Sequence, residues 1–390
     1  MKVVIAPDSF KGSLTAKQAG EAIERGLKKV LADGSFMVVP MADGGEGTLQ
    51  CLLDATQGRK LQAIVKDPLG RDIVADYGIL GDGQTCMIEL AAASGLYLLE
   101  PQERNPAITT TYGFGQLIKA GLDQGCRHFL LGLGGSATND GGAGMLQALG
   151  YALLGEAGQP IGWGGGQLHK LREIRREECD PRLAECRFII ACDVTNPLIG
   201  AKGASFVFGP QKGADRTMCE RLDQNLTHFA DVIQRTTGVA IHHLPGAGAA
   251  GGIAGALLAL LDGKLQSGID LVIQATGLER LLPGSDLVIT GEGQVDGQTA
   301  QGKTPLGVAK LAQRYKIPTI VLAGSVGQGI DSLYQHGVQA VVSIVNRPMT
   351  LEVAMADAAA LVESAAEQVM RIYTGGRSVS QLGKTDQRYQ

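Results

Sequence analysis

Acidic and basic residues stand among glycines at several points of the sequence where a predicted strand ends. Asp8 and Lys11 follow an apolar run that begins at Val3, and a predicted helix starts a few residues later. A lysine just before a helix N-terminus can neutralise a phosphate that the helix amides also face. The alternative for this segment is an ordinary strand-to-helix turn. We treat Asp8 and Lys11 as candidate catalytic residues.

A second segment, 41–48, holds two carboxylates among three glycines, those of Asp43 and Glu46. Carboxylates in a flexible loop suit a hydrated magnesium ion or a substrate hydroxyl. Simple turn chemistry is the alternative. We predict that Asp43 and Glu46 are magnesium ligands.

Residues 297–304 match the Walker A expression, with Lys303 as the lysine that contacts phosphate. We expect the preceding strand to end near Thr290, so that Glu292 and Asp296 intervene, whereas a Walker A loop follows its strand directly. Acids beside a phosphate make sense chiefly when a metal lies between them. The segment therefore predicts a metal-phosphate loop of another kind, in which Glu292 and Asp296 hold magnesium. A purely structural loop is the alternative.

A longer glycine-rich loop, 132–142, follows a predicted strand and precedes an apolar helix. Unpaired loop amides and a helix N-terminus can together cradle an anion. The candidate nucleotide- or substrate-binding residues of this loop are Gly134, Gly135, Ser136, Asn139 and Asp140. The loop also fits the dinucleotide fingerprint, as does 246–251, which contains the further candidate Gly248. The first match is prolonged before its helix and the second lacks a clean strand, but a nicotinamide-dependent oxidoreductase of a small hydroxy acid stays open.

The segment after the predicted strand Phe188–Cys192 carries a further acid, Asp193, and the chain then turns at Asn196. An acid at the end of a buried strand can accept the proton of a substrate hydroxyl, as phosphoryl transfer often requires. An Asx turn is the alternative. We expect Asp193 to be the base and Asn196 to orient either that carboxylate or the substrate. Asp8 is the competing base.

The order of predicted elements indicates a doubly wound α/β domain made from both chain ends. Strands and helices alternate there, and the first helix begins with a capping box at Thr15. Short alternating runs between Leu61 and Glu89 indicate antiparallel strands of an inserted, mixed α/β domain. We expect the site in the cleft between the domains. The expected boundaries are 1–60 and 280–376 for the doubly wound domain, 61–279 for the inserted domain and 377–390 for a polar tail.

Composition excludes several classes of protein. A net charge of −4 gives no general attraction to nucleic acid or to anionic membranes. The seven cysteines form no CxxC pair, so neither a zinc site nor a disulfide framework is indicated. The longest apolar stretch, Ala254–Leu261, is too short to span a membrane, and the N-terminal run is too short for a signal peptide. We expect a cytoplasmic protein without nucleic-acid or membrane partners, and a homo-oligomer stays open.

Taken in order, these segments resemble the bacterial glycerate kinase family. The matching blocks extend as far as Lys303 and read PDSFKGSLTA, MADGGEGT, RNPAITTTYGFG, GLGGSATNDGG, CDVTNPL, PGAGAAGG and GEGQVDGQTAQGK. The resemblance implies a flavodoxin-like domain built from both chain ends with an inserted α/β domain. It also implies ATP-dependent phosphorylation of D-glycerate with Mg²⁺, the bacterial enzymes of this type giving 2-phosphoglycerate, with 3-phosphoglycerate as the alternative product.

The family's blocks single out a set of positions in this chain, for which the roles given above are our own interpretation. These positions are Asp8, Lys11, Asp43, Glu46, Asn139, Asp193, Asn196, Glu292, Asp296 and Lys303. A nucleotide-binding regulatory protein that uses the same loops without turnover is another alternative. The acids beside the glycines disfavour it, because a sensor needs no base for a hydroxyl.

Overall fold

The computed structural model describes residues 1–45, 47–297, 299 and 302–385, the part from 376 onward by its backbone alone. The chain divides into two compact units. The terminal unit comprises Met1–Asp43 and the chain from Val272 onward, and the central unit comprises Gly44–Leu271. Within the described residues, no helix is both long enough and apolar enough to cross a membrane.

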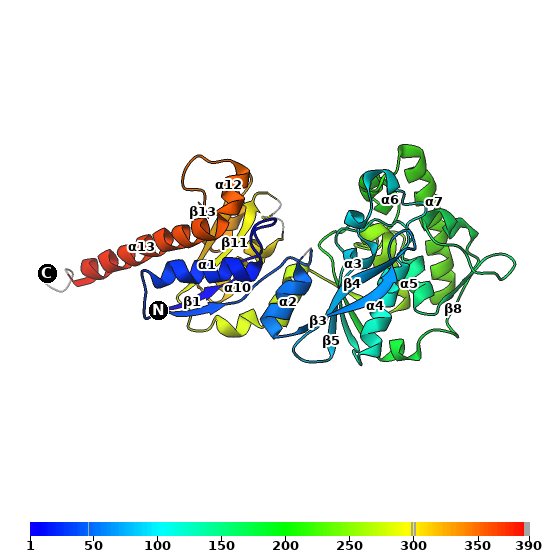
Figure 1. Cartoon of the computed structure of the whole chain (residues 1–390), viewed down its shortest axis with the longest axis horizontal. Helices are drawn as coiled ribbons and strands as arrows, with labels where there is room; N and C mark the ends of the chain where they lie inside the picture. The colour runs from blue at the N-terminus through cyan, green and yellow to red at the C-terminus, as the bar shows by residue number, and fades with distance from the viewer. Residues whose placement is uncertain (46, 298, 300–301, 386–390) are drawn as a thin grey trace. The chain divides into compact units, whose positions relative to one another are not determined.

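The terminal unit contains a five-stranded sheet whose strands are all parallel, in the order β2-β1-β11-β12-β13 (Figure 1). The strand bounds are β1 Lys2–Ile5, β2 Ser35–Val38, β11 Leu287–Val295, β12 Thr319–Val326 and β13 Val338–Ser343. This order is the 2-1-3-4-5 order of flavodoxin-like sheets, so the expected doubly wound fold is confirmed. The direction in which successive strands are added to the sheet reverses between β1 and β11. Sheets of this kind bind ligands at that point.

Successive residues of β12 face opposite layers of helices, because side chains alternate along a strand. Ile320 and Leu322 belong to the same buried cluster as residues of α1 (Ala16–Lys28) and α13 (Ala358–Thr385). Val321 and Ala323 belong to the other cluster, which includes residues of α10 (Thr304–Arg314) and α11 (Asp331–Gln335). The sheet is therefore covered on both faces, as a parallel sheet requires.

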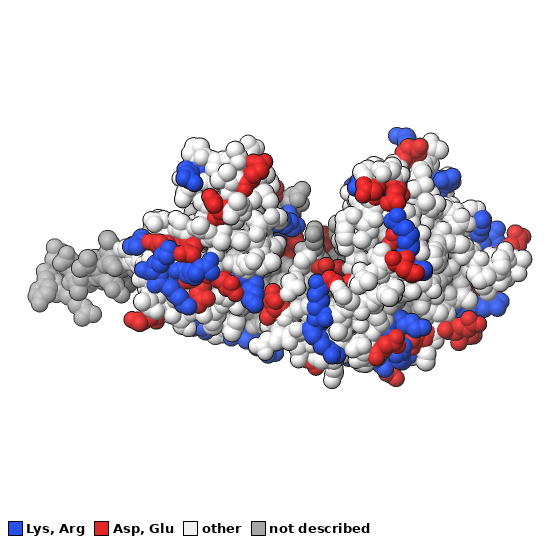
Figure 2. Space-filling model, in the orientation of Figure 1, with Lys and Arg blue, Asp and Glu red and all other residues white. Residues whose placement is uncertain are grey.

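Helix α1 begins as expected, with a capping box between Thr15 and Gln18. It lies beside α13, and the two helices are joined on their outer side by ion pairs from Arg25 and Lys29 to Glu363. Figure 2 shows basic and acidic side chains intermingled over this part of the surface. Exposed ion pairs of this kind contribute little to stability, so the packed apolar face is what holds the helices together.

The central unit is built on a mixed six-stranded sheet in the order β10-β9-β6-β5-β4-β3. The strand bounds are β3 Arg59–Lys66, β4 Asp72–Ile79, β5 Thr85–Glu89, β6 His128–Gly132, β9 Arg187–Ala191 and β10 Lys264–Gln266. The first three are antiparallel neighbours, as expected, and the others are parallel. The short strands β7 (Ala152–Leu154) and β8 (Glu173–Arg175) form a separate antiparallel pair.

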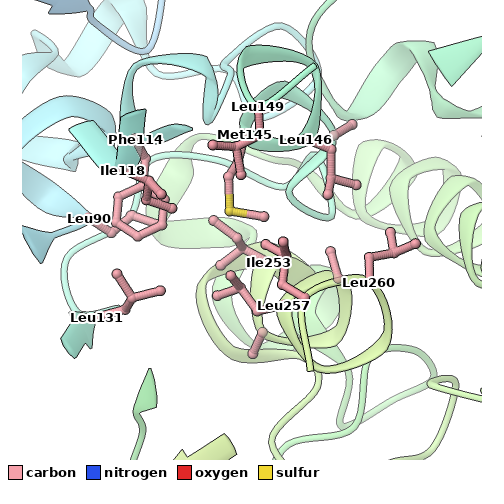
Figure 3. Close-up of a cluster of buried hydrophobic side chains, with 14 of the residues drawn as sticks. Leu90, Phe114, Ile118, Leu131, Met145, Leu146, Leu149, Ile253, Leu257 and Leu260 are labelled. Carbon is pink, nitrogen blue, oxygen red and sulfur yellow. The ribbon is translucent and has the colours of Figure 1, made fainter. Parts of the chain in front are cut away.

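Helices bury their apolar faces in one large core of the central unit (Figure 3). Phe114 and Ile118 come from one helix, Met145 from a second and Leu257 from a third. The helix bounds are α2 Thr48–Thr56, α3 Ala91–Ser94, α4 Tyr112–Asp123, α5 Ala143–Ala148, α6 Ala204–Phe208, α7 Arg216–Thr237, α8 Ile253–Leu260 and α9 Gly268–Thr276. This core positions the loops that follow β6 and β9.

Several bounds differ from those expected from the sequence. Along the chain, the boundaries between the units follow Asp43 and Leu271, not residues 60 and 279. Helix α2 belongs to the central unit because its Leu49 and Leu53 lie against Gly78 in the central sheet. The segment after Thr350 forms two helices, α12 (Leu351–Ala356) and α13, and the expected polar tail is helical as far as Thr385. Strand β11 continues past Thr290 to Val295, so the expected strand end was wrong.

Candidate active site

Two buried carboxylates lie at the point of the terminal sheet where the winding reverses. Asp8 follows β1, and Glu292 lies in the last part of β11, the neighbouring strand. Their backbones are joined, since the Asp8 amide donates to the carbonyl of Gly291 at 2.8 Å. Both side chains are less than a tenth exposed. The strand ends that flavodoxin-like sheets use for ligands thus carry two acids that sequence reasoning singled out.

The Asp8 carboxylate is held by donors on both oxygens. Oδ1 accepts from the Ser9 amide at 2.6 Å, and Oδ2 accepts from the hydroxyl of Thr304 at 2.6 Å. Burial raises the pKa of Asp8 to about 6, the Thr304 hydrogen bond opposes this rise, and the charge of Asp43 adds to it. Loss of solvent therefore disfavours the charged form of Asp8. The Ser9 amide and the Thr304 hydroxyl hold its carboxylate in place.

Glu292 is in a similar environment. Its Oε1 accepts a short hydrogen bond from the hydroxyl of Thr299. Burial raises the pKa of Glu292 to about 7; the Thr299 bond and the charge of Lys303 lower it, and Asp8 and Asp43 raise it further. Three acids and two lysines, Lys11 and Lys303, therefore act on one another electrostatically. A cation added between the acids would favour their charged forms.

Asp8, Glu292 and Lys303 border a cavity of about 600 Å³ within the terminal unit. Its polar wall includes Asp8, Lys11, Glu292, Asp296 and Lys303. The opposite part of its lining is apolar and comes from the chain around α12, which contributes side chains such as Leu351 and Met355. A pocket with a few converging polar groups and an apolar wall is the common form of a small-molecule site.

The predicted phosphate-contacting and metal-holding residues of the loop before α10 are placed as follows. Lys303 is the residue before the first helical residue, Thr304. Asp296 accepts from the Gln294 side chain at 3.1 Å and from the Thr299 amide at 3.3 Å. Glu46, predicted as a magnesium ligand, lies outside the described residues.

The acids of this site suit a magnesium ion that takes most of its other ligands from phosphate and water. In the described part of the chain, no three His, Cys, Asp or Glu side chains are grouped as a metal site of their own. Magnesium in phosphoryl-transfer sites is usually held by one or two carboxylates together with waters and substrate phosphates. The oxygen-only donors Asp43, Glu292 and Asp296, of which Glu292 is buried, suit such an ion and do not suit a softer metal.

The glycine-rich loop of the central unit is organised around the buried Asp140. Its Oδ2 accepts from the amide and the hydroxyl of Thr111 at 2.8 Å each and from the Gly144 amide, and its Oδ1 accepts from the Gly142 amide. Asn139 is also fully buried and donates to the Ser205 hydroxyl at 2.9 Å. These contacts show that both side chains shape the loop, and their predicted ligand contacts stay predictions. Gly134 and Gly135 are exposed on the loop.

The segment after β9 is fixed by its neighbours in the central unit. Asp193 is exposed, and one of its oxygens accepts from the Gly268 amide at 3.1 Å. Asn196 donates to the Lys202 carbonyl at 2.8 Å. Gly248, a candidate ligand contact, is buried against this segment, and a Cβ there would lie 2.1 Å from the Pro197 carbonyl. Its glycine is therefore required for close packing of the two loops.

Comparisons with known proteins agree with this arrangement. The model of the glycerate kinase family matches residues 3–374. The chain is 50% identical to a glycerate kinase of Halalkalibacterium halodurans, covering 96% of this chain and 99% of that protein. It is 49% identical to the glycerate 2-kinase of Escherichia coli, covering 90% and 92%. A crystal structure assigned to glycerate kinase 2 of Salmonella typhimurium LT2 matches it with a TM-score of 0.90 and 47% identity, covering 97% and 99%.

The chain belongs to the glycerate kinase family. The resemblance drawn from the sequence blocks is thereby confirmed, and so is the prediction of a kinase. The family match extends over both dinucleotide-fingerprint segments, 132–137 and 246–251, and leaves the oxidoreductase alternative without support.

Two residues with buried polar contacts are not among those that the sequence of this glycerate kinase family member singled out. Thr304, the last residue of the Walker A match, donates to Asp8. Lys212 is a fully buried lysine that donates to Ser136 and to the Thr138 carbonyl at 2.7 Å each. Thr304 was visible as a hydroxyl next to a candidate lysine. Lys212 gave no signal, because a lysine in a turn is normally a solvated surface residue.

Proposed function

We propose that this member of the glycerate kinase family transfers the γ-phosphoryl group of ATP to the 2-hydroxyl of D-glycerate. The observation that carries the proposal is the cluster of Asp8, Glu292 and Lys303 beside one cavity, where a flavodoxin-like sheet reverses its winding. The names of the relatives supply the acceptor, and the glycerate 2-kinase of Escherichia coli supports the 2-position. A cytoplasmic location, where ATP is supplied, is part of the proposal.

Lys303 and Lys11 are the residues to which we assign phosphate contacts. Lys303 directly precedes α10, so its ammonium group and the first amides of that helix can serve the same anion. Lys11 is exposed at the wall of the same cavity. Phosphoryl transfer depends mainly on positioning and on neutralising charge at the transferred group. Two lysines in a protein with a net charge of −4 can do this locally.

Glu292, Asp296 and Asp43 are the residues that would hold Mg²⁺, directly or through water. Magnesium bound there would neutralise negative charge on the phosphate oxygens. Glu292 needs such a partner most, because its carboxylate is buried near two other acids. Glu46 remains a predicted ligand from the sequence.

Asp193 is the residue to which we assign the base. Its carboxylate is exposed at the end of β9 and is fixed by the Gly268 amide. In the proposed step, Asp193 takes the proton of the glycerate hydroxyl, the hydroxyl oxygen forms a bond to the γ-phosphorus, and the bond from that phosphorus to the bridging oxygen breaks to release ADP. Asn196 is proposed to orient the substrate or the carboxylate.

The proposal is tested by measuring ADP release from ATP and Mg²⁺ with D-glycerate, with L-glycerate and without an acceptor. The expected result is ADP release that depends on D-glycerate. Lys303→Met, purified in the same way, controls for contaminating kinases, since a contaminant would leave its activity unchanged. Release that does not depend on D-glycerate would contradict the proposal.

A further inference from the structure

A buried lysine lies beneath the glycine-rich loop of the central unit. Lys212 ends the short 3₁₀ helix Pro210–Lys212, and its side chain is 1% exposed. Its ammonium nitrogen donates to the Ser136 hydroxyl and to the Thr138 carbonyl, both at 2.7 Å. Burial of a charged group is costly unless it is hydrogen-bonded and compensated. Burying this lysine therefore costs free energy of folding, and its side-chain nitrogen contacts two residues of one loop.

The chemistry of the ammonium group decides the direction of the hydrogen bond at Ser136. In its ammonium form Lys212 can only donate, so the Ser136 oxygen accepts from it in that form. The hydroxyl proton of Ser136 then points away from Lys212 and has to find an acceptor elsewhere. Asp140 is the charged group that favours the ammonium form here, while burial lowers the pKa of Lys212 to about 7.

The loop around Ser136 is fixed on its other side as well. The Ala137 amide donates to the Ser94 carbonyl at 2.9 Å, and the Leu96 amide donates to the Gly135 carbonyl at 2.8 Å. The exposed residues Gly134 and Gly135 come immediately before Ser136. The hydroxyl of Ser136 is thus held in place beside these exposed glycines, and Lys212 sets the direction in which it can donate a hydrogen bond.

We propose that Lys212 is a positioning residue that fixes the Ser136 hydroxyl as a hydrogen-bond donor to an anionic oxygen of the bound reactants. That oxygen belongs either to the glycerate carboxylate or to a phosphate of the nucleotide, which present the same chemistry to a hydroxyl. Lys212 does not contact the ligand itself, because it is enclosed by the protein. The inference rests on the proposed function and adds to it the residue that positions the Ser136 hydroxyl in the glycine-rich loop.

The test measures kcat and the KM values for D-glycerate and for ATP in wild type, Ser136→Ala, Lys212→Met and the double variant. We expect Ser136→Ala to raise one of the two KM values by about 10- to 100-fold, the size of a lost hydrogen bond to a charged group. Lys212→Met should raise the same KM, and the double variant should be no worse than Ser136→Ala. A rise for D-glycerate identifies the carboxylate, and a rise for ATP identifies a phosphate.

Tyr151→Phe is the matched control for lost stability. Its hydroxyl donates to the Leu260 carbonyl at 2.9 Å in the same core. We expect it to lower Tm without changing either KM. The inference is wrong if Ser136→Ala leaves both KM values unchanged, or if the effects of the two variants simply add. If Lys212→Met does not fold, unchanged KM values in Ser136→Ala still refute the inference. A wild-type enzyme inactive on D-glycerate would instead contradict the proposed function.

Discussion

The hydroxyl of Thr304 donates a hydrogen bond of 2.6 Å to the carboxylate of Asp8, across 296 positions of the sequence. The bond joins the first residue of α10 to the turn after β1. It thereby fixes the start of the helix that Lys303 precedes. The candidate phosphate contact and the acid at the end of β1 are parts of one hydrogen-bonded structure.

Removing this bond should reduce stability in a way that depends on pH. Thr304→Val leaves Oδ2 of a buried carboxylate without its donor, at a cost of about 1–3 kcal/mol. The pKa of Asp8 is about 6, so the loss should be larger at pH 8, where the carboxylate is charged, than at pH 5. Urea unfolding at both pH values measures this. Thr304→Ser keeps the hydroxyl and should behave nearly as wild type; equal losses at both pH values would count against the argument.

The charge of Lys303 should be needed for phosphoryl transfer and not for folding. Lys303→Met should lower kcat by about 10²–10³-fold, as expected for one lost donor to charge that develops in the transition state. Lys310 lies exposed on the same helix, and Lys310→Met is the matched control. Steady-state kinetics with saturating D-glycerate distinguishes them. Comparable activity of the two variants would remove Lys303 from the mechanism.

Asp296 should affect the dependence on magnesium. Asp296→Asn keeps the shape of the side chain and removes its charge, so a higher Mg²⁺ concentration should be needed for half-maximal rate, by about 10-fold. Asp331→Asn changes an exposed acid elsewhere in the terminal unit and serves as the control. The rate is titrated with magnesium at constant ATP. An unchanged titration curve for Asp296→Asn would show that this acid does not hold the ion.

Glu292 should make the ligand-free protein less stable as the pH rises. Its pKa is about 7 in the folded state and lies near 4.5 in the unfolded chain, so the folded state binds more protons between these values. Stability therefore falls as pH increases through this window, by an amount on the order of 3 kcal/mol. Glu292→Gln lacks the titrating group and should show a smaller decrease in Tm from pH 5 to pH 8. A variant with the same pH profile as wild type would refute the assignment.

The choice of base is tested by two substitutions measured together. Asp193→Asn should lower kcat by about 10²–10⁴-fold while ATP still binds, because it removes the group that accepts the hydroxyl proton. Asp8→Asn should have a smaller effect on kcat. ATP binding is followed by calorimetry in the absence of acceptor. Normal turnover by Asp193→Asn together with an inactive Asp8→Asn would make Asp8 the base.

The strands and the split domain could be predicted from the sequence because they depend on local patterns. The same patterns gave the candidate site residues, whose roles stay predictions. Apolar runs of strand length that end just before an acid identified the positions of Asp8 and Asp193. The end of β11 could not be predicted in this way, because the glycines in its last part are typical of a loop. In the structure, glycine allows β11 and β12 to approach closely: a Cβ on Gly324 would lie 2.4 Å from the Gly293 carbonyl.

The roles of Lys212 and Asp140 depend on contacts that no local pattern carries. Ser136 and Lys212 are 76 positions apart, and their hydrogen bond exists only once the central core brings their loops together. Asp140 read as an acid in an anion-binding loop, yet burial and four hydrogen bonds make it part of the loop's framework. Burial is decided by tertiary packing, so the sequence could mark these positions without assigning what they do.

The most direct test of the central claim is proton-coupled phosphorus NMR of the product made from D-glycerate, ATP and Mg²⁺. A phosphate on the 2-hydroxyl couples to the single proton at C2, and its signal is a doublet. We predict this doublet, together with an equal amount of ADP, and a doublet that forms much more slowly with Lys303→Met. A triplet, from coupling to the two protons at C3, would show transfer to the 3-hydroxyl and contradict the account, as would the absence of any phosphoglycerate signal.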